Sequence, residues 1–326
     1  MSGQIISGTV VGIAAFIFSV IIAPGLIRFF RYLKYGQTVR DDGPASHKAK
    51  AGVPTMGGII FLTGAILGLV VRNRWSGPMA ALVVLILGFA LIGLLDDLII
   101  VVRKRPLGLK ARYKLLIQII LASAFAVYLY THPQTTAGMT WRVPFSHLEW
   151  NLPPWLFFPL TVFVLVGSVN AVNLSDGLDG LAIGTSGISL MVLAILCFWS
   201  GYSDLLYVSL ALAGACLGFA WFNAHPAQVF MGDTGALALG GALGGLALMS
   251  GNILFLPIFG GIFVAETLSV VIQVVMFRLT GQRWLKMSPL HHHFELSGWD
   301  EPKVVIRFWI AGLILGLLGL LGYIRF

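Results

Sequence analysis

An adjacent acidic pair, Asp96-Asp97, follows Gly93-Leu94-Leu95 at the predicted end of an apolar block. Two acids at a helix C-terminus repel each other and are opposed by the helix dipole. A bound cation would relieve both costs. A solvated helix end is the alternative interpretation.

A third acid, Asp233, lies between glycines in the segment Phe230–Gly235. Glycines allow the backbone to approach a ligand closely. A carboxylate beside Thr234 suits Mg²⁺, which uses few protein carboxylates together with substrate phosphates. The alternative is an N-cap, in which Asp233 or Thr234 stabilises the helix that follows.

Three further motifs add polar groups. In Asn173–Gly180, a helix would place Asn173, Asp176 and Asp179 on one face at i, i+3 and i+6. The triple histidine of Ser288–Glu295 can donate hydrogen bonds to a diphosphate, whereas zinc would need partner residues at metal spacing that are missing. The stretch Lys48–Gly58 places lysines beside a Gly/Pro-rich turn that could cradle a phosphate or a base edge, although topology alone also places lysines there.

The elements that position these motifs are membrane helices. Hydrophobic residues make up 58% of the 326 residues and charged residues only 10%. The apolar residues form blocks long enough to cross a bilayer, where only helices satisfy their own backbone. We predict an all-α polytopic membrane protein and a single domain, 1–326, of about ten spans. These run over 5–27, 56–71, 79–95, 115–131, 155–172, 181–200, 205–223, 235–250, 254–278 and 304–324.

Most of the 21 Lys and Arg residues fall in one set of alternate loops, which is therefore predicted to be cytoplasmic, with both termini outside. The net charge of +8 reflects this topology and some attraction to anionic lipids, and it indicates no nucleic-acid partner. Most of the 13 acids share the cytoplasmic face, although topology does not require it. The two cysteines, Cys197 and Cys216, fall inside predicted spans and are expected to be packing residues.

Several features have structural interpretations. The glycines of 240–245 predict close helix packing, Pro257 with Gly260 predicts a bend, and 132–154 predicts a small hairpin or a surface helix. Glu266, deep in a span, is either functional or paired within the bundle. An acid-lined transporter would explain Glu266, but not the triple histidine or the acids gathered on one face.

Together, in order, these motifs resemble the phospho-N-acetylmuramoyl-pentapeptide transferase family over nearly the whole chain. The motifs are Arg40–Pro44, Pro54–Gly58, Asp96-Asp97, Asn173–Gly180, Phe230–Gly235 and Pro289–Glu295, followed by Gly298–Glu301. The resemblance implies a ten-span homodimer in the bacterial inner membrane, surrounded by membrane lipids, with a cytoplasmic active site. It would transfer phospho-MurNAc-pentapeptide from UDP-MurNAc-pentapeptide to undecaprenyl phosphate, releasing UMP and requiring Mg²⁺. A neighbouring branch uses UDP-GlcNAc and is the alternative.

The resemblance also assigns roles. Asp233 matches the Mg²⁺ ligand, and the implied catalytic residues are Asp96, Asp97, Asp233, His291 and His292. The implied substrate-binding residues are Lys50, Thr55, Asn173, Asp176, Asp179, Asn223, Phe230, Lys110, Arg112 and His293. The chain departs from the family pattern at Val53, where a first threonine is usual, and at Ile100, where relatives usually carry a lysine. Lys110, Arg112 and Lys114 are cations available in place of that lysine. We expect direct attack by the lipid phosphate, with an aspartyl-phosphosugar intermediate on Asp96 or Asp97 as the alternative.

Overall fold

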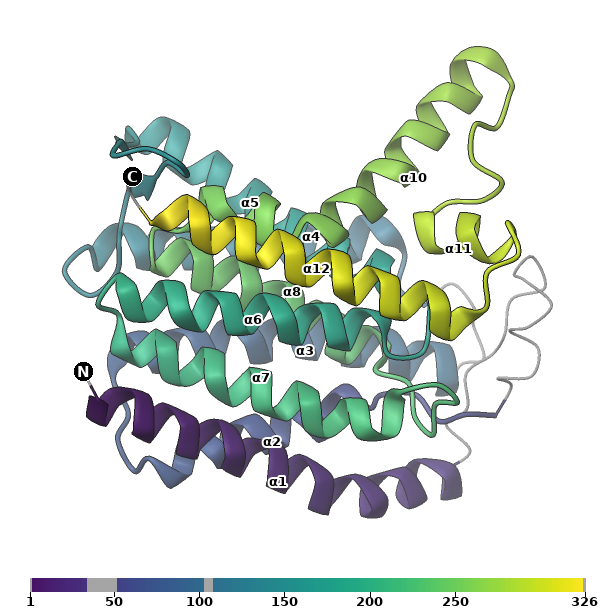
Figure 1. Cartoon of the computed structure of the whole chain (residues 1–326), viewed down its shortest axis with the longest axis horizontal. Coiled ribbons are helices and arrows are strands. Elements are labelled where there is room, and N and C mark those ends of the chain that lie inside the picture. Colours follow the sequence, from purple (N-terminus) through teal and green to yellow (C-terminus); the bar gives the residue numbers. More distant parts are fainter. Residues whose placement is uncertain (1, 34–51, 103–107, 325–326) are drawn as a thin grey trace.

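The computed structural model describes residues 2–33, 52–102 and 108–324, which form a bundle of helices (Figure 1). The predicted sites at Arg40–Pro44 and Lys50 lie outside these residues. The helices are α1 (Ser2–Tyr32), α2 (Gly58–Val71), α3 (Gly77–Val102), α4 (Ala111–Thr131), α5 (Pro154–Ser175), α6 (Leu181–Trp199), α7 (Ser203–Asn223), α8 (Gly232–Met249), α9 (Leu256–Phe259), α10 (Gly261–Thr280), α11 (Leu290–Glu295) and α12 (Glu301–Tyr323), with a 3₁₀ turn, η2 (Ile253–Phe255).

The membrane character predicted from composition is confirmed. Among the described residues, eight helices are long and apolar enough to cross a bilayer: α1, α3, α4, α5, α6, α7, α10 and α12. The second predicted span corresponds to α2, an apolar helix of 14 residues. The eighth corresponds to α8, which is rich in glycine and almost wholly buried among the other helices.

One boundary prediction was wrong. The acidic pair does not end its helix, because α3 continues through the apolar residues after Asp97 to Val102. Asp96 and Asp97 are therefore both buried inside α3, more than a turn before its end. The helix dipole bears on them less than the sequence suggested, and their partners must be found in neighbouring helices.

Small residues let the neighbours of α8 approach it closely. A Cβ at Gly240 would lie 2.4 Å from Cα of Val169 in α5, and one at Gly241 would lie 2.4 Å from the ring of Phe89 in α3. The hydroxyl of Ser168 also donates to the Gly240 carbonyl at 2.9 Å. The predicted packing role of these glycines is confirmed, and α8 forms the centre of the bundle (Figure 1).

The predicted bend near Pro257 is a break. α9 ends at Phe259, and α10 begins after Gly260 and projects away from the bundle (Figure 1). The proposed hairpin is also found: β1 (Thr140–Arg142) and β2 (Glu149–Asn151) pair antiparallel, with Trp141 opposite Trp150.

The two ends of the bundle differ. α1 begins and α12 ends at one end, on the left of Figure 1, and α11 with its histidines lies at the other. The triple histidine therefore lies at the end of the bundle opposite the termini. Cys197 and Cys216 are free and buried, in keeping with a packing role.

Candidate active site

Asp97 fastens α3 to the start of α8. Its Oδ1 accepts a hydrogen bond from the backbone N–H of Asp233 at 3.1 Å, and its Oδ2 accepts from the backbone N–H and the hydroxyl of Thr234 at 2.9 and 2.6 Å. The first N–H groups of a helix have no partner within it. Asp97 supplies that partner from another helix, so the cap predicted for Asp233 or Thr234 comes from Asp97.

Two glycines make this junction possible. A Cβ at Gly93 of α3 would lie 2.1 Å from the carbonyl oxygen of Asp233. Gly232 has a positive φ of 69°, and a Cβ there would lie 2.6 Å from Oδ2 of Asp97. The glycine that precedes Asp233 in the sequence is therefore needed both for its backbone angle and for the room that it leaves.

Lys114, from the first turn of α4, joins the other two acids. Its ammonium donates to Oδ2 of Asp96 at 2.9 Å and also to Oδ2 of Asp233. Asp96 accepts a further hydrogen bond of 2.5 Å from the backbone N–H of Leu109. Three helices, α3, α4 and α8, thus bring one cation and two carboxylates together.

Asn173 completes the cluster from the last turn of α5, where its side-chain amide donates to Oδ1 of Asp233 at 2.7 Å. When ionised, the three acids and Lys114 leave two negative charges in excess. Asp233 is the acid most open to solvent, with 23% of its side chain exposed against 8% for Asp96. The cluster therefore favours a cation, and Asp233 offers the most accessible oxygens.

The donor set fits Mg²⁺. Carboxylate oxygens are hard ligands, and Mg²⁺ at phosphate-transfer sites takes only one or two of them beside the substrate phosphates. Asp97 is committed to α8, so Asp233 and, next, Asp96 are the residues that would hold the ion. Lys114 would have to share or leave the Asp233 carboxylate when the ion binds.

A second polar cluster lies among the loops next to Asn173–Gly180. Asp179, His225 and Glu301 place their ligand atoms within 4.8 Å of one another. His225 Nδ1 lies 3.1 Å from Asp179 and 3.5 Å from Glu301, and Glu301 accepts the backbone N–H of Asp179 at 2.7 Å. Because hydrogen bonds already join the three, we interpret the group as a clasp between loops. The sequence analysis gave neither His225 nor Glu301 a role: Glu301 only ended the motif Gly298–Glu301, and no local pattern marks His225.

Asn223 ties the same loops from the end of α7. Its side-chain oxygen accepts from the backbone N–H of Gly180 at 3.1 Å, and its amide donates to the Val229 carbonyl at 2.9 Å. The side chain is 4% exposed, so its evident work is to hold the segment before Phe230 against the segment after Asp179.

The conditional prediction that Asn173, Asp176 and Asp179 share one helical face was wrong. α5 ends at Ser175, and Asp176 is its C-cap with non-helical angles. Glycines at 177 and 180 favour this ending, and Gly180 has a φ of 83°. Asn173 consequently turns to Asp233, whereas Asp179 belongs to the clasp.

Thr55 and Phe230 lie on two segments that pair through their backbones. Phe230 N–H donates to the Pro54 carbonyl, and Gly57 N–H donates to the Phe230 carbonyl, both at 2.8 Å. Thr55 is buried beside Gly232, and Phe230 is partly exposed. These two predicted substrate-binding residues thus lie on segments next to the turn that carries Asp233.

The three histidines have three different environments. His291 is fully buried, with Nδ1 3.1 Å from the Glu266 carboxylate. His292 Nδ1 lies 2.8 Å from Glu295, and His293 Nδ1 accepts the backbone N–H of Lys286 at 3.1 Å. Of the three, the histidine next to Glu266 is the one the fold encloses most tightly.

Of the three cations Lys110, Arg112 and Lys114, Lys114 is the one that contacts the acids Asp96 and Asp233. Lys110 is the exposed N-cap of α4, and the Arg112 guanidinium lies 4.8 Å above the ring of Tyr113, with a hydrogen bond to the Tyr113 hydroxyl. Sequence identified a basic stretch but could not say which member turns inward. Lys110 and Arg112 stay predicted substrate-binding residues.

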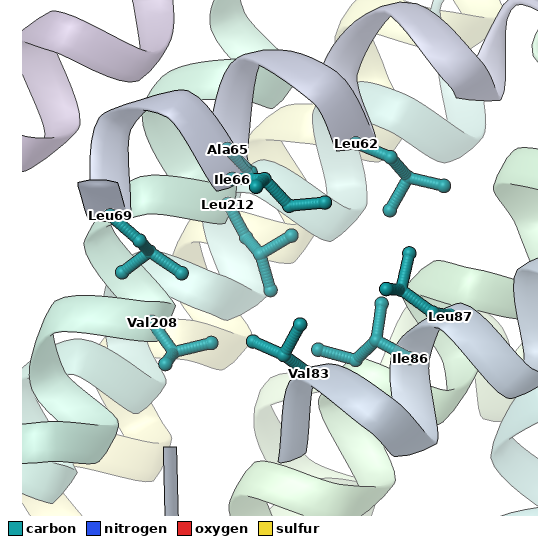
Figure 2. A pocket seen from close by; sticks show the side chains of 9 residues that line it. All are labelled: Leu62, Ala65, Ile66, Leu69, Val83, Ile86, Leu87, Val208 and Leu212. Carbon is teal, nitrogen blue, oxygen red and sulfur yellow. The ribbon is translucent and has the colours of Figure 1, made fainter. Parts of the chain in front are cut away.

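A hollow between α2, α3 and α7 has different chemistry. Figure 2 shows aliphatic side chains around it, among them Leu62, Val83 and Leu212. Since these side chains offer neither charge nor a hydrogen-bonding group, the hollow does not suit phosphate chemistry. The polar cluster around Asp233 is the candidate active site.

Comparison with known proteins bears on this cluster directly. The model of Glycosyl transferase family 4 matches residues 79–251, and a phospho-N-acetylmuramoyl-pentapeptide-transferase signature matches residues 50–62. The chain is 51% identical over 322 residues to a phospho-N-acetylmuramoyl-pentapeptide-transferase of Desulforamulus reducens, covering 96% of each chain. It is 50% and 48% identical over 325 residues to those of Bacillus velezensis and Bacillus subtilis, covering 98% of each chain.

Proposed function

Because the chain belongs to the phospho-N-acetylmuramoyl-pentapeptide-transferase family, we propose that it transfers phospho-MurNAc-pentapeptide from UDP-MurNAc-pentapeptide to undecaprenyl phosphate. The products are lipid I and UMP, and the step belongs to peptidoglycan synthesis. The observation that carries the proposal is the convergence of Asp96, Lys114 and Asn173 on Asp233, within the residues that the family model matches.

For this reaction the protein must align the two substrates and neutralise the charge on their phosphates. Transfer of a phosphoryl group between oxygens needs alignment and neutralisation more than covalent help. Mg²⁺ held by Asp233 would offset the negative charge that develops on the leaving UMP. Lys114 supplies a fixed positive charge beside Asp96, where the acceptor phosphate would meet the site.

The contacts of the acids support direct attack by the lipid phosphate. Both oxygens of Asp97 accept hydrogen bonds from α8, which makes Asp97 a poor nucleophile and a good anchor. Asp96 is held by Leu109 and Lys114 and can orient the acceptor phosphate. A phosphate monoester, with its second pKa near 6, is mostly dianionic at neutral pH and needs no strong base.

The nucleotide side of the substrate is assigned to the segments around the clasp. Thr55, Asn223 and Phe230 lie on backbone segments that adjoin the Asp233 turn, and Asp179 borders them. This supports binding of the UDP portion between these segments, with the diphosphate toward Asp233. Lys50, Asp176, His292 and His293 are proposed contacts of the same substrate.

The surroundings of the enzyme are proposals too. We place it in the bacterial inner membrane as a homodimer, with the Asp233 end cytoplasmic and both termini outside. The presence of α11 and the termini at opposite ends of the bundle supports this orientation (Figure 1).

The test is UMP release by purified protein from UDP-MurNAc-pentapeptide and undecaprenyl phosphate, with and without Mg²⁺. UDP-GlcNAc is the parallel donor. Asp233→Ala removes the proposed ligand, and Asp204→Asn is the matched control, since Asp204 pairs with Arg72 away from the cluster. We expect Mg²⁺-dependent release from the muramoyl donor that only Asp233→Ala abolishes. Release from UDP-GlcNAc alone would assign the chain to the neighbouring branch.

A further inference from the structure

α10 carries polar side chains on one buried face although most of the helix is exposed. Glu266, Ser269 and Gln273 recur at i, i+3 and i+7 and are 0%, 7% and 8% exposed. The side of the helix that points away from them is apolar and exposed, with Leu268, Val271, Val274 and Val275. A buried acid inside a membrane helix is costly, so it is retained where a partner or a task requires it.

Gln273 grips the chain that leads to the triple histidine. Its side-chain amide donates to the Leu285 carbonyl at 2.9 Å, and its side-chain oxygen accepts the Leu285 N–H at 3.0 Å. This pair of bonds recognises one residue of backbone and fixes its register. Figure 1 shows the segment after α10 returning from the far end of that helix to α11.

Glu266 contacts the triple-histidine segment from the same face of α10, about two turns before Gln273. Its Oε1 lies 3.1 Å from Nδ1 of His291, and its Oε2 accepts the His291 backbone N–H at 3.4 Å. Among the described residues, Glu266 Oε1 and both ring nitrogens of His291 are buried without a hydrogen bond of good geometry. A carboxylate beside one imidazole nitrogen favours the proton on that nitrogen and fixes the ring.

The other side of the His291 ring touches the motif that supplies Asn173. A Cβ at Gly177 would lie 2.2 Å from Nε2 of His291, so only a glycine leaves room for the ring. Asn173, four residues earlier, donates to Asp233. The contacts therefore run from α10 through His291 to the loop beside the candidate metal ligand.

We propose that Glu266 and Gln273 are positioning residues for catalysis: Gln273 sets the register of the segment before α11, and Glu266 orients the His291 ring against Gly177. With Nδ1 directed to Glu266, the ring is held with Nε2 against Gly177, in the segment that follows Asn173. The inference rests on the proposed function and adds to it two residues of the lipid-exposed helix.

The test is a double-mutant cycle on UMP release by the purified full chain. Glu266→Gln keeps the size of the side chain and removes its charge. We expect it to lower kcat about tenfold with KM of both substrates changed less than about threefold, because the ring is misplaced while binding persists. In a His291→Asn background the same change is expected to cost less than about twofold, because the two residues act as one unit. Glu266→Asp, which keeps the carboxylate, is expected to recover part of the loss.

Gln273→Leu tests the register half of the proposal and serves if Glu266→Gln fails to fold. Val274→Ala, one residue away on the lipid face, is its matched control. We expect Gln273→Leu to lower kcat about tenfold, and again less than about twofold in the His291→Asn background. Thermal unfolding of each variant in detergent is measured alongside.

The outcomes separate the two proposals. If wild-type protein releases no UMP, the proposed function fails. If it does, and Glu266→Gln and Gln273→Leu match Val274→Ala, the positioning role fails while the function stands. If Glu266→Gln and Gln273→Leu lower kcat by the same factor in the His291→Asn background as in the wild-type background, the positioning role also fails. Such a result would show that the two residues act independently of the His291 ring.

Discussion

Asp97 accepts two hydrogen bonds from Thr234, one from its backbone N–H at 2.9 Å and one from its hydroxyl at 2.6 Å, across a separation of 137 positions in the chain. The contact sets where α8 begins relative to α3. It therefore sets where Asp233 stands relative to Asp96. The two neighbouring acids therefore have different roles. Asp97 holds α8 against α3, whereas Asp96 lies beside Lys114 in the candidate active site.

Asp97→Ala should destabilise the protein more than Asp96→Asn does. It leaves buried N–H groups of α8 without an acceptor, which we expect to cost about 2 kcal/mol or more. Thermal unfolding of the purified variants in detergent measures the difference, and Thr234→Val should show part of the loss. An unchanged unfolding midpoint for Asp97→Ala would remove the capping role.

Lys114→Met should lower kcat/KM by about 100-fold, because it removes the fixed positive charge between Asp96 and Asp233 where phosphates would lie. Lys303→Met, an exposed lysine in the first turn of α12, is the control. UMP release at varied undecaprenyl phosphate measures the effect. Lys110→Gln and Arg112→Gln should each lose less than Lys114→Met, and a reversed order would shift the lipid-phosphate contact to the outer cations.

Asn173→Ala should raise the Mg²⁺ concentration needed for half-maximal activity by about tenfold, as is usual when a hydrogen-bond partner of a metal ligand is removed. Asn173 holds one oxygen of Asp233 at 2.7 Å, so its loss leaves the carboxylate free to rotate out of the position that the amide fixes. A Mg²⁺ titration of UMP release measures the shift, and chelation of the metal should abolish release from every variant. If the Mg²⁺ concentration for half-maximal activity is unchanged in Asn173→Ala, Asn173 does not support the metal site.

Gly177→Ala should lower kcat by about tenfold, since the new methyl group would displace the His291 ring. Gly167→Ala in α5 is the matched control, because a Cβ there meets nothing within 4 Å. Steady-state kinetics of the two variants make the comparison. Equal kcat values for Gly177→Ala and Gly167→Ala would show that displacing the His291 ring does not affect catalysis.

The sequence by itself determined the helices and the kind of chemistry. Apolar blocks of bilayer length dictate helices because lipid offers no partner for backbone groups. Local signals predicted a bend near Gly260, where the structure has a break, and they left a hairpin or a surface helix open for the segment that forms the hairpin around Trp141 and Trp150. The resemblance identified the family, which the comparisons confirm.

Only the tertiary structure decided how the polar residues divide their work. Asp97 became an anchor, Lys114 rather than Lys110 or Arg112 reached the acids, and Glu266 met His291. Each of these contacts joins residues from different helices, and local periodicity carries no information about which helix faces of a bundle meet. At Gly93, Gly177 and Gly232 the lack of a side chain lets particular segments come into contact. Whether a side chain would fit at such a position depends on the packing of the folded molecule and cannot be seen in the local sequence.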